Sequence, residues 1–214
     1  MTATTPAYAP ILEVAPSQPE DEVIQQTVDV LRNGGVIALP TDTLYGLACV
    51  YGHRQGVERI QTMRGFDKAA RPLTFLLPDL GELPKYAVVG ESAHAVLRKI
   101  FPGPYCAELT ASPDVPEPFV HEDRQTIGVR IPATALCEKL LWALGKPLLS
   151  ATAKSPSGDV LQTAAEIRRE YGRNLDLILD GGSLSGPPST VVSLAGDWVT
   201  VIREGRGPAN RLMA

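Results

Sequence analysis

Leu39-Pro40-Thr41-Asp42-Thr43-Leu44-Tyr45-Gly46-Leu47 is the stretch that decides the fold. It ends an apolar run, Val36 to Leu39, that is typical of a buried strand, and the chain becomes apolar again from Leu47 to Val50. Polar groups at the end of a buried strand must each find a partner, or they cost stability. In open α/β sheets, ligands bind at the carboxyl ends of strands. The stretch therefore predicts a strand of an α/β sheet with a ligand site at its end.

Length and composition favour one globular domain in a reducing compartment. The chain has 214 residues, of which 44% are hydrophobic and 21% charged, and no apolar run is long enough to cross a bilayer. Its first twenty residues lack the pattern of a secretory signal, and Cys49, Cys106 and Cys137 are too few and too scattered for a disulfide framework. We therefore expect a cytoplasmic protein without membrane association. The net charge of −4 argues against indiscriminate nucleic-acid binding but leaves room for a local basic groove.

Helix and strand patterns alternate along the chain. Residues 1–18, rich in Ala, Pro and Thr, predict a flexible N-terminal arm, and residues 19–214 predict one domain. Helical spacing marks helices around Val23–Leu31, Val57–Met63, Ala93–Ile100, Leu136–Leu144 and Thr163–Gly172. Strands are predicted at Val36–Leu39, Leu73–Leu77, Thr126–Ile131, Leu148–Leu149, Leu175–Leu179, Thr190–Leu194 and Trp198–Ile202. This interleaving predicts a single α/β domain with a twisted, mixed β-sheet flanked by helices.

Several predicted strand ends carry hydroxyl groups or arginines. They are Thr41-Asp42-Thr43, Arg130, Ser150-Ala151-Thr152, Ser189-Thr190 and Arg203, while Arg64, Lys68 and Arg71 add positive charge between a helix and the next strand. Hydroxyls, backbone amides and guanidinium groups bind phosphate and carboxylate. The set therefore predicts a site for an anionic small molecule, most simply a nucleotide. Each residue taken alone has a structural alternative as a turn residue or helix cap, and Asp42 is as consistent with capping its turn as with a role in the site.

Common catalytic motifs are absent from the sequence. There is no GxxxxGK[ST] loop, no GxGxxG after a strand and no GxSxG elbow. His53, His94 and His121 are scattered and predicted to be surface residues, so no metal site of the protein's own is expected.

Taken in order, the segments resemble the YrdC-like family of L-threonylcarbamoyladenylate synthases. The matching pieces are Pro40 to Leu47, Pro102-Gly103-Pro104, Gly128 to Pro132, Ser150-Ala151, Ser189 to Val192 and Arg203-Glu204-Gly205, which span nearly the whole chain beyond the arm. The resemblance implies a YrdC-like fold, in which a mixed sheet surrounds a concave basic groove. It also implies a reaction in which threonine, bicarbonate and ATP give threonylcarbamoyl-AMP and pyrophosphate, for the modification of an adenosine in tRNA.

The same resemblance implies roles for residues. Threonine and its carbamate would lie near Thr41, Tyr45, Arg130 and Ser189, and the nucleotide near Arg64, Lys68, Arg71, Ser150, Thr152 and Arg203. ATP would be a substrate, with Mg bound through its phosphates. No tightly bound cofactor is expected, and a catalytic residue is not assigned.

Four positions depart from the family pattern. The usual Lys-x-Arg pair falls on Arg64-Gly65-Phe66, the Thr after Pro-Gly-Pro is Cys106, Ser-Ala-Asn ends in Thr152, and the Asp after Ser-Thr-Val-Val is Ser193. With the segments Arg124 to Arg130 and Asp180-Gly181-Gly182, this altered set is more similar to the YciO branch. That branch implies binding of a nucleotide and of an RNA, either tRNA or double-stranded RNA. The alternatives are an active synthase and a hydrolase that removes the threonylcarbamoyl group.

Overall fold

The described part of the chain folds into five α-helices and a long mixed sheet. The computed structural model describes residues 8–65, 72–121, 123–196 and 198–212. The helices are α1 (Asp21–Arg32), α2 (Arg54–Met63), α3 (Glu91–Ile100), α4 (Ala135–Leu144) and α5 (Ala164–Tyr171), with short 3-10 turns at Leu80–Lys85, Glu117–Phe119 and Ala209–Leu212. The strands are β1 (Ile11–Glu13), β2 (Ile37–Pro40), β3 (Tyr45–Val50), β4 (Thr74–Leu76), β5 (Ala87–Val88), β6 (Tyr105–Ala111), β7 (Thr126–Arg130), β8 (Leu148–Thr152), β9 (Leu177–Asp180), β10 (Thr190–Ser193) and β11 (Thr200–Arg203).

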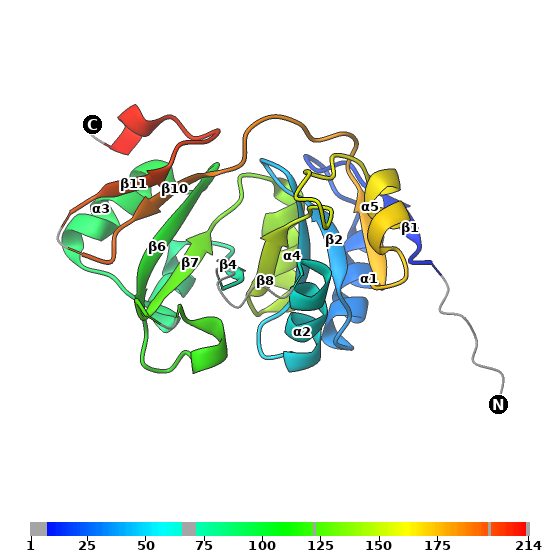
Figure 1. The fold of residues 1–214 in the computed structure, drawn as a ribbon, viewed down its shortest axis with the longest axis horizontal. Coiled ribbons are helices and arrows are strands. Elements are labelled where there is room, and N and C mark those ends of the chain that lie inside the picture. The colour runs from blue at the N-terminus through cyan, green and yellow to red at the C-terminus, as the bar shows by residue number, and fades with distance from the viewer. Residues whose placement is uncertain (1–7, 66–71, 122, 197, 213–214) are drawn as a thin grey trace.

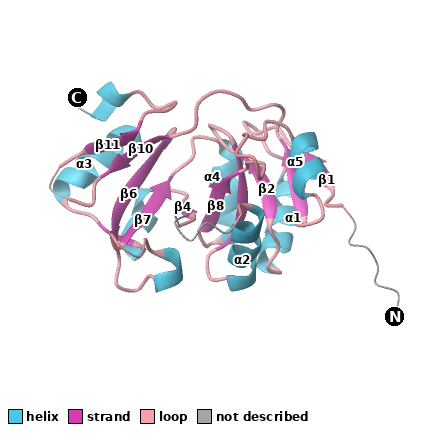
Figure 2. Ribbon diagram, in the orientation of Figure 1, coloured by secondary structure: helices cyan, strands magenta, loops and turns pink. Residues whose placement is uncertain are grey.

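The strands form one twisted sheet in the order β1-β9-β2-β3-β8-β4-β7-β6-β10-β11, with β5 paired to β6 (Figures 1 and 2). The sheet is mixed: it contains parallel pairs such as β4–β7 and β6–β10 and antiparallel pairs such as β2–β3 and β3–β8. The segment between β9 and β10 crosses from one half of the sheet to the other, as the orange loop in Figure 1 shows. No helix among the described residues is long and apolar enough to cross a membrane.

Both faces of the sheet are buried, because residues of one strand alternate between two apolar cores. In β2, Ile37 and Leu39 join the core under α1 and α4, while Ala38 joins the core on the opposite face. This second core holds Ile60 of α2 and Ile167 of α5, among others. Strands with this double burial are typical of α/β folds.

Most of the predicted elements are present. The five helices lie where their spacing predicts them, Thr163 and Glu166 form the reciprocal hydrogen bonds of a capping box, and Gly145 ends α4 in the left-handed conformation at a φ of 69°. The single α/β domain with a twisted mixed sheet is confirmed.

The predicted N-terminal arm needs correction for its described part. Ile11–Glu13 form β1, which pairs in parallel with β9 along Ile11 and Ile178, and Ala9 donates its amide hydrogen to the carbonyl of Gly172. A three-residue strand beside prolines has no periodic signal of its own, since it depends on the free edge of β9. Residues 1–7 lie outside the described residues.

Candidate functional site

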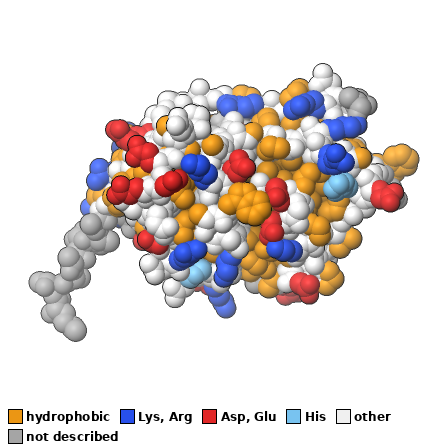
Figure 3. Space-filling view, turned by 180° about the vertical axis from the view of Figure 1, so that it is seen from behind, with side chains coloured by type: hydrophobic (Ala, Val, Ile, Leu, Met, Phe, Trp, Pro, Cys, Tyr) orange, Lys and Arg blue, Asp and Glu red, His pale blue; other side chains and the backbone are white. Residues whose placement is uncertain are grey.

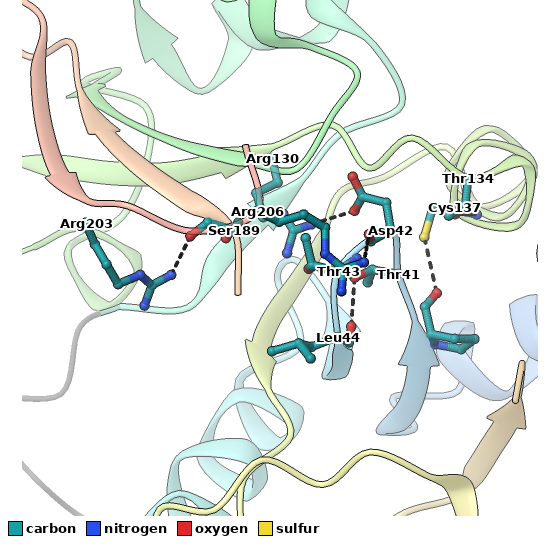
Figure 4. Close-up of polar contacts among 11 residues, drawn as sticks. Thr41, Asp42, Thr43, Leu44, Arg130, Thr134, Cys137, Ser189, Arg203 and Arg206 are labelled. Carbon is teal, nitrogen blue, oxygen red and sulfur yellow. Dashed lines mark hydrogen bonds and ion pairs between the residues drawn. The ribbon is translucent and has the colours of Figure 1, made fainter. Parts of the chain in front are cut away.

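The Thr41–Leu44 segment forms the tight connection between antiparallel strands β2 and β3. The Thr41 hydroxyl donates to the carbonyl of Leu44 at 2.7 Å and accepts the amide hydrogen of Thr43 at 3.2 Å. Both threonine side chains are buried, so the hydroxyls replace the water that the turn would otherwise need. The turn holds the residue between them, Asp42, away from its own backbone (Figure 4).

Asp42 forms a buried ion pair with Arg130, at the end of β7. The distance from Arg130 Nη2 to Asp42 Oδ1 is 2.6 Å, and the two side chains are only 12% and 9% exposed. Among the described residues, Arg130 Nε and Asp42 Oδ2 are buried without a hydrogen-bond partner. Arg206 also donates to the backbone carbonyl of Asp42 at 2.9 Å. These two atoms are shielded from solvent, while other parts of the Arg130 side chain border open space.

That space is a cavity of about 500 Å³ on the concave side of the sheet. It is lined by eight of the residues predicted for the site: Thr41, Tyr45, Arg64, Arg130, Ser150, Thr152, Ser189 and Arg203. Lys68 and Arg71, and with them Phe66, lie outside the described residues. The structure therefore brings together predicted side chains from points more than 150 residues apart in sequence, while their individual roles stay predictions.

Sheet register explains why these side chains meet. Across four strands, Ser150 of β8 pairs with Thr74 of β4, and Gly128 of β7 pairs with Glu108 of β6. Phe75 pairs with Val129, which places Thr74 beside Gly128. Because residues in register share a face, their side chains form one polar row along the cavity wall. Adjacent to it, Arg130 aligns with Cys106, and Cys106 with Val191.

The position of Ser150 at the cavity depends on the close approach of strands β3 and β8. A Cβ on Gly46 of β3 would lie 2.5 Å from Ser150 Oγ, so only glycine leaves room for that hydroxyl at the cavity.

Besides lining the cavity, Tyr45 and Ser189 make hydrogen bonds that hold its wall. The Tyr45 hydroxyl donates to the carbonyl of Gly182 at 2.7 Å and accepts from the amide of Gly181 at 3.0 Å. Burial raises the pKa of this phenol to about 12, so it stays protonated at neutral pH. The carbonyl of Ser189 accepts from Arg203 Nη2 at 2.8 Å. These bonds join the sheet to the β9–β10 connection and fix the cavity wall.

The lining residues outside the predicted set include Thr74, Cys106, Glu108, His121, Arg124 and Lys154. The signal for two of them was present, because in Cys106-Ala107-Glu108-Leu109 polar and apolar residues alternate as in a half-buried strand. Ala107 and Leu109 are fully buried in the core, so Cys106 and Glu108 face the cavity. His121, predicted to be a surface residue, also lines the cavity, with Nδ1 buried and unpartnered among the described residues.

Positive charge dominates the cavity. Its described lining includes Arg64, Arg124, Arg130, Lys154 and Arg203 but a single carboxylate, Glu108, which is paired with Arg124 at 3.0 Å. Burial lowers the pKa of Arg64, although a guanidinium remains charged at neutral pH. On the face of the molecule shown in Figure 3, acidic and basic side chains are interspersed instead. The cation excess is therefore a property of the cavity, and it suits an anionic ligand.

The described residues contain no group of three or more His, Cys, Asp and Glu side chains placed to hold a metal ion. A divalent cation in this cavity would therefore need most of its oxygen ligands from the bound anion and water.

Comparison with known proteins shows close relatives. Residues 29–205 match the Sua5–YciO–YrdC family, which carries the description telomere recombination. The uncharacterized protein YciO of Escherichia coli K12 is 35% identical over 195 residues, which cover 91% of this chain and 94% of YciO. The threonylcarbamoyl-AMP synthase of Nitrosococcus oceani is 34% identical over 161 residues, which cover 74% of this chain and 86% of the synthase.

Solved structures are similar over nearly the whole chain. The crystal structure of E. coli YciO aligns with a TM-score of 0.90 at 33% identity, covering 95% of this chain and 99% of YciO. The crystal structure of P. abyssi Sua5 complexed with L-threonine aligns with a TM-score of 0.84 at 26% identity, covering 92% of this chain and 58% of that Sua5 chain.

Proposed function

We propose that this chain, which belongs to the Sua5–YciO–YrdC family, binds ATP or AMP in its cavity together with a threonine-type group, in connection with threonylcarbamoyl-adenosine modification of tRNA. The family assignment made from the motifs, including the similarity to YciO, is confirmed. One relative is named a threonylcarbamoyl-AMP synthase and another is solved with L-threonine, which supports a ligand of this chemistry.

The observation that carries the proposal is the convergence of guanidinium and hydroxyl groups on one cavity. A volume of about 500 Å³ falls within the range of small-molecule sites. Arg64, Arg203 and the hydroxyls of Ser150 and Thr152 would bind phosphate oxygens, and Lys68 and Arg71 would add charge. Thr41 and the guanidinium group of Arg130 would face the carboxylate of the threonine-type group.

A second candidate, active synthesis of threonylcarbamoyl-AMP, is favoured by the name of the N. oceani relative. Threonine and bicarbonate would condense to a carbamate with loss of water, and a carbamate oxygen would attack the α-phosphorus of ATP as pyrophosphate leaves. The arginines would neutralise the charge of the reacting phosphates. Mg would sit on phosphate oxygens, since the carboxylate in the described lining is already paired.

Titration calorimetry with ATP, AMP and threonine tests the binding proposal, and pyrophosphate release tests the synthase. In the release assay, threonine, bicarbonate and ATP are each omitted in turn. Release that needs all three establishes a synthase. Binding of ATP or AMP without release supports the proposal in its binding form, and absence of nucleotide binding by the folded protein refutes it.

The tRNA link is tested by salt dependence. Because contacts to several phosphates release counterions, RNA binding through the cavity would weaken steeply as salt rises. Titration of tRNA at two salt concentrations, with wild type and Arg203→Ala, measures this. Binding that neither salt nor the substitution affects would contradict an RNA contact at this site.

A further inference from the structure

The far wall of the cavity carries a second kind of recognition surface. Glu108, Arg124 and His121 line it together, and none of them was predicted as a site residue. Arg124 Nη1 donates to Glu108 Oε1 at 3.0 Å, and the Glu108 side chain is 12% exposed. A carboxylate buried to this degree on a face lined by cations requires a specific reason, because it reduces the attraction for an anion.

The sheet register shows where this surface lies relative to the phosphate-binding groups. Ser150, Thr74, Gly128 and Glu108 occupy successive strands in one row, so three strand spacings separate Ser150 from Glu108. At about 4.8 Å per spacing, the row is about 14 Å long. A free amino acid is too short to reach from one end to the other, whereas a nucleotide is not.

Chemistry restricts what Glu108 can bind. An ionised carboxylate is an acceptor with about four lone-pair positions, and Arg124 uses one of them while balancing its charge. The remaining positions suit uncharged N–H or O–H donors and repel phosphate. The neighbouring residue in the row, Gly128, has no side chain and also lines the cavity, so it does not cover the carboxylate. His121 lines the same wall.

We propose that Glu108, held by Arg124 and flanked by His121, recognises the N–H and O–H donors of the nucleoside part of the ligand, while Ser150 at the other end of the row, together with Arg64 after α2, binds its phosphates. The inference rests on the proposed function, since it assigns the orientation of the nucleotide in the same cavity. The donors are either the amino group of adenine or the hydroxyls of ribose.

The test compares ATP with inorganic tripolyphosphate, which carries the phosphates without the nucleoside. Glu108→Gln should weaken ATP binding by about tenfold, the loss expected when a charged acceptor is removed. It should leave tripolyphosphate binding unchanged or stronger, because it removes a charge that repels phosphate. Arg64→Ala should weaken both ligands, because Arg64 lies at the phosphate end of the cavity. Glu58→Gln is the matched control, because Glu58 forms an exposed ion pair with Arg54 on α2 and should change neither.

Three ATP analogues distinguish the donors. If Glu108 accepts from the adenine amino group, wild type and Glu108→Gln should bind ITP with the same weakened affinity. If it accepts from a ribose hydroxyl, the two proteins should instead bind 2′-deoxy-ATP or 3′-deoxy-ATP with the same weakened affinity. Thermal unfolding of each variant confirms that it is folded. Equal losses for ATP and tripolyphosphate in Glu108→Gln, or no loss for ATP, overturn the inference while nucleotide binding by wild type still supports the proposed function. Failure of wild type to bind ATP or AMP overturns both.

Discussion

The buried pair of Arg130 and Asp42 combines a structural and a ligand-binding role in two residues. Arg130→Ala removes the guanidinium and leaves the carboxylate of Asp42 buried without its counterion, which should lower the free energy of unfolding by about 3 kcal/mol. The same change should weaken ATP or threonine binding at least about tenfold, because it removes a charged donor from the cavity. Denaturant unfolding and calorimetry measure the two effects.

Asp42→Asn separates these roles. It keeps the cation and removes the opposing charge, so stability should fall while affinity for an anion is unchanged or higher. If Arg130→Ala keeps its affinity for ATP and threonine, the role of Arg130 is structural, as the ion-pair partner of Asp42.

Tyr45 illustrates how one hydroxyl makes stability depend on pH. Tyr45→Phe leaves the carbonyl of Gly182 without its donor and should cost about 1–2 kcal/mol. Burial raises the phenol pKa from the usual 10.0 to about 12, so the folded state holds its proton more tightly than the unfolded state. Its contribution is complete below pH 10 and is lost as pH rises from 10 to 12. Urea unfolding at pH 9 to 11 should therefore show a shallower decline for Tyr45→Phe, and parallel declines would contradict this account.

At the scale of elements, the close packing of the antiparallel strands β3 and β8 depends on Gly46, which has no side chain. In Gly46→Ala the new Cβ would meet Ser150 Oγ at 2.5 Å, so strand or serine must shift. We expect a loss of about 1–3 kcal/mol in stability, as for overpacking elsewhere, together with weaker nucleotide binding because the Ser150 hydroxyl is displaced. Unfolding and calorimetry of Gly46→Ala are compared with Gly196→Ala, whose Cβ would have nothing within 4 Å. Unchanged nucleotide affinity in Gly46→Ala would contradict a contact between the Ser150 hydroxyl and the nucleotide.

Elements with their own periodicity or caps were predictable from sequence, and those defined by a neighbour were not. The stripe of α4 and its terminal Gly145 identify that helix without any tertiary information. By contrast, β1 is only three residues long and forms because β9 offers a free edge. The same distinction applies to the residues of the site. Arg130 and Ser150 could be identified from sequence, because they lie at the ends of predicted strands or in short runs of polar residues. Glu108 lies within a strand, and its place in the cavity follows from its register with Gly128.

At the scale of the whole molecule, the connection from β9 to β10, residues 181–189, joins the two halves of the sheet beside the cavity (Figure 1). Arg206, near the C-terminus, donates to the carbonyls of Ser185 in this connection and of Asp42 in the β2–β3 turn. One side chain thus links three distant segments, and its contacts reach Arg130 through Asp42. This arrangement makes the shape of the cavity depend on the C-terminal segment.

Arg206→Ala should loosen that link without unfolding the sheet. The backbone amides of Leu184, Ser185, Gly186 and Ser189 should exchange hydrogen faster, because the segment loses the contact that holds it to the β2–β3 turn. Nucleotide affinity should fall by about tenfold, since part of the binding energy must then order the segment. Arg32→Ala is the matched control, because Arg32 also donates to a backbone carbonyl, that of Ala143, on a surface remote from the cavity lining. Loss of nucleotide affinity without faster exchange would show that Arg206 contacts the ligand itself rather than positioning the wall around it.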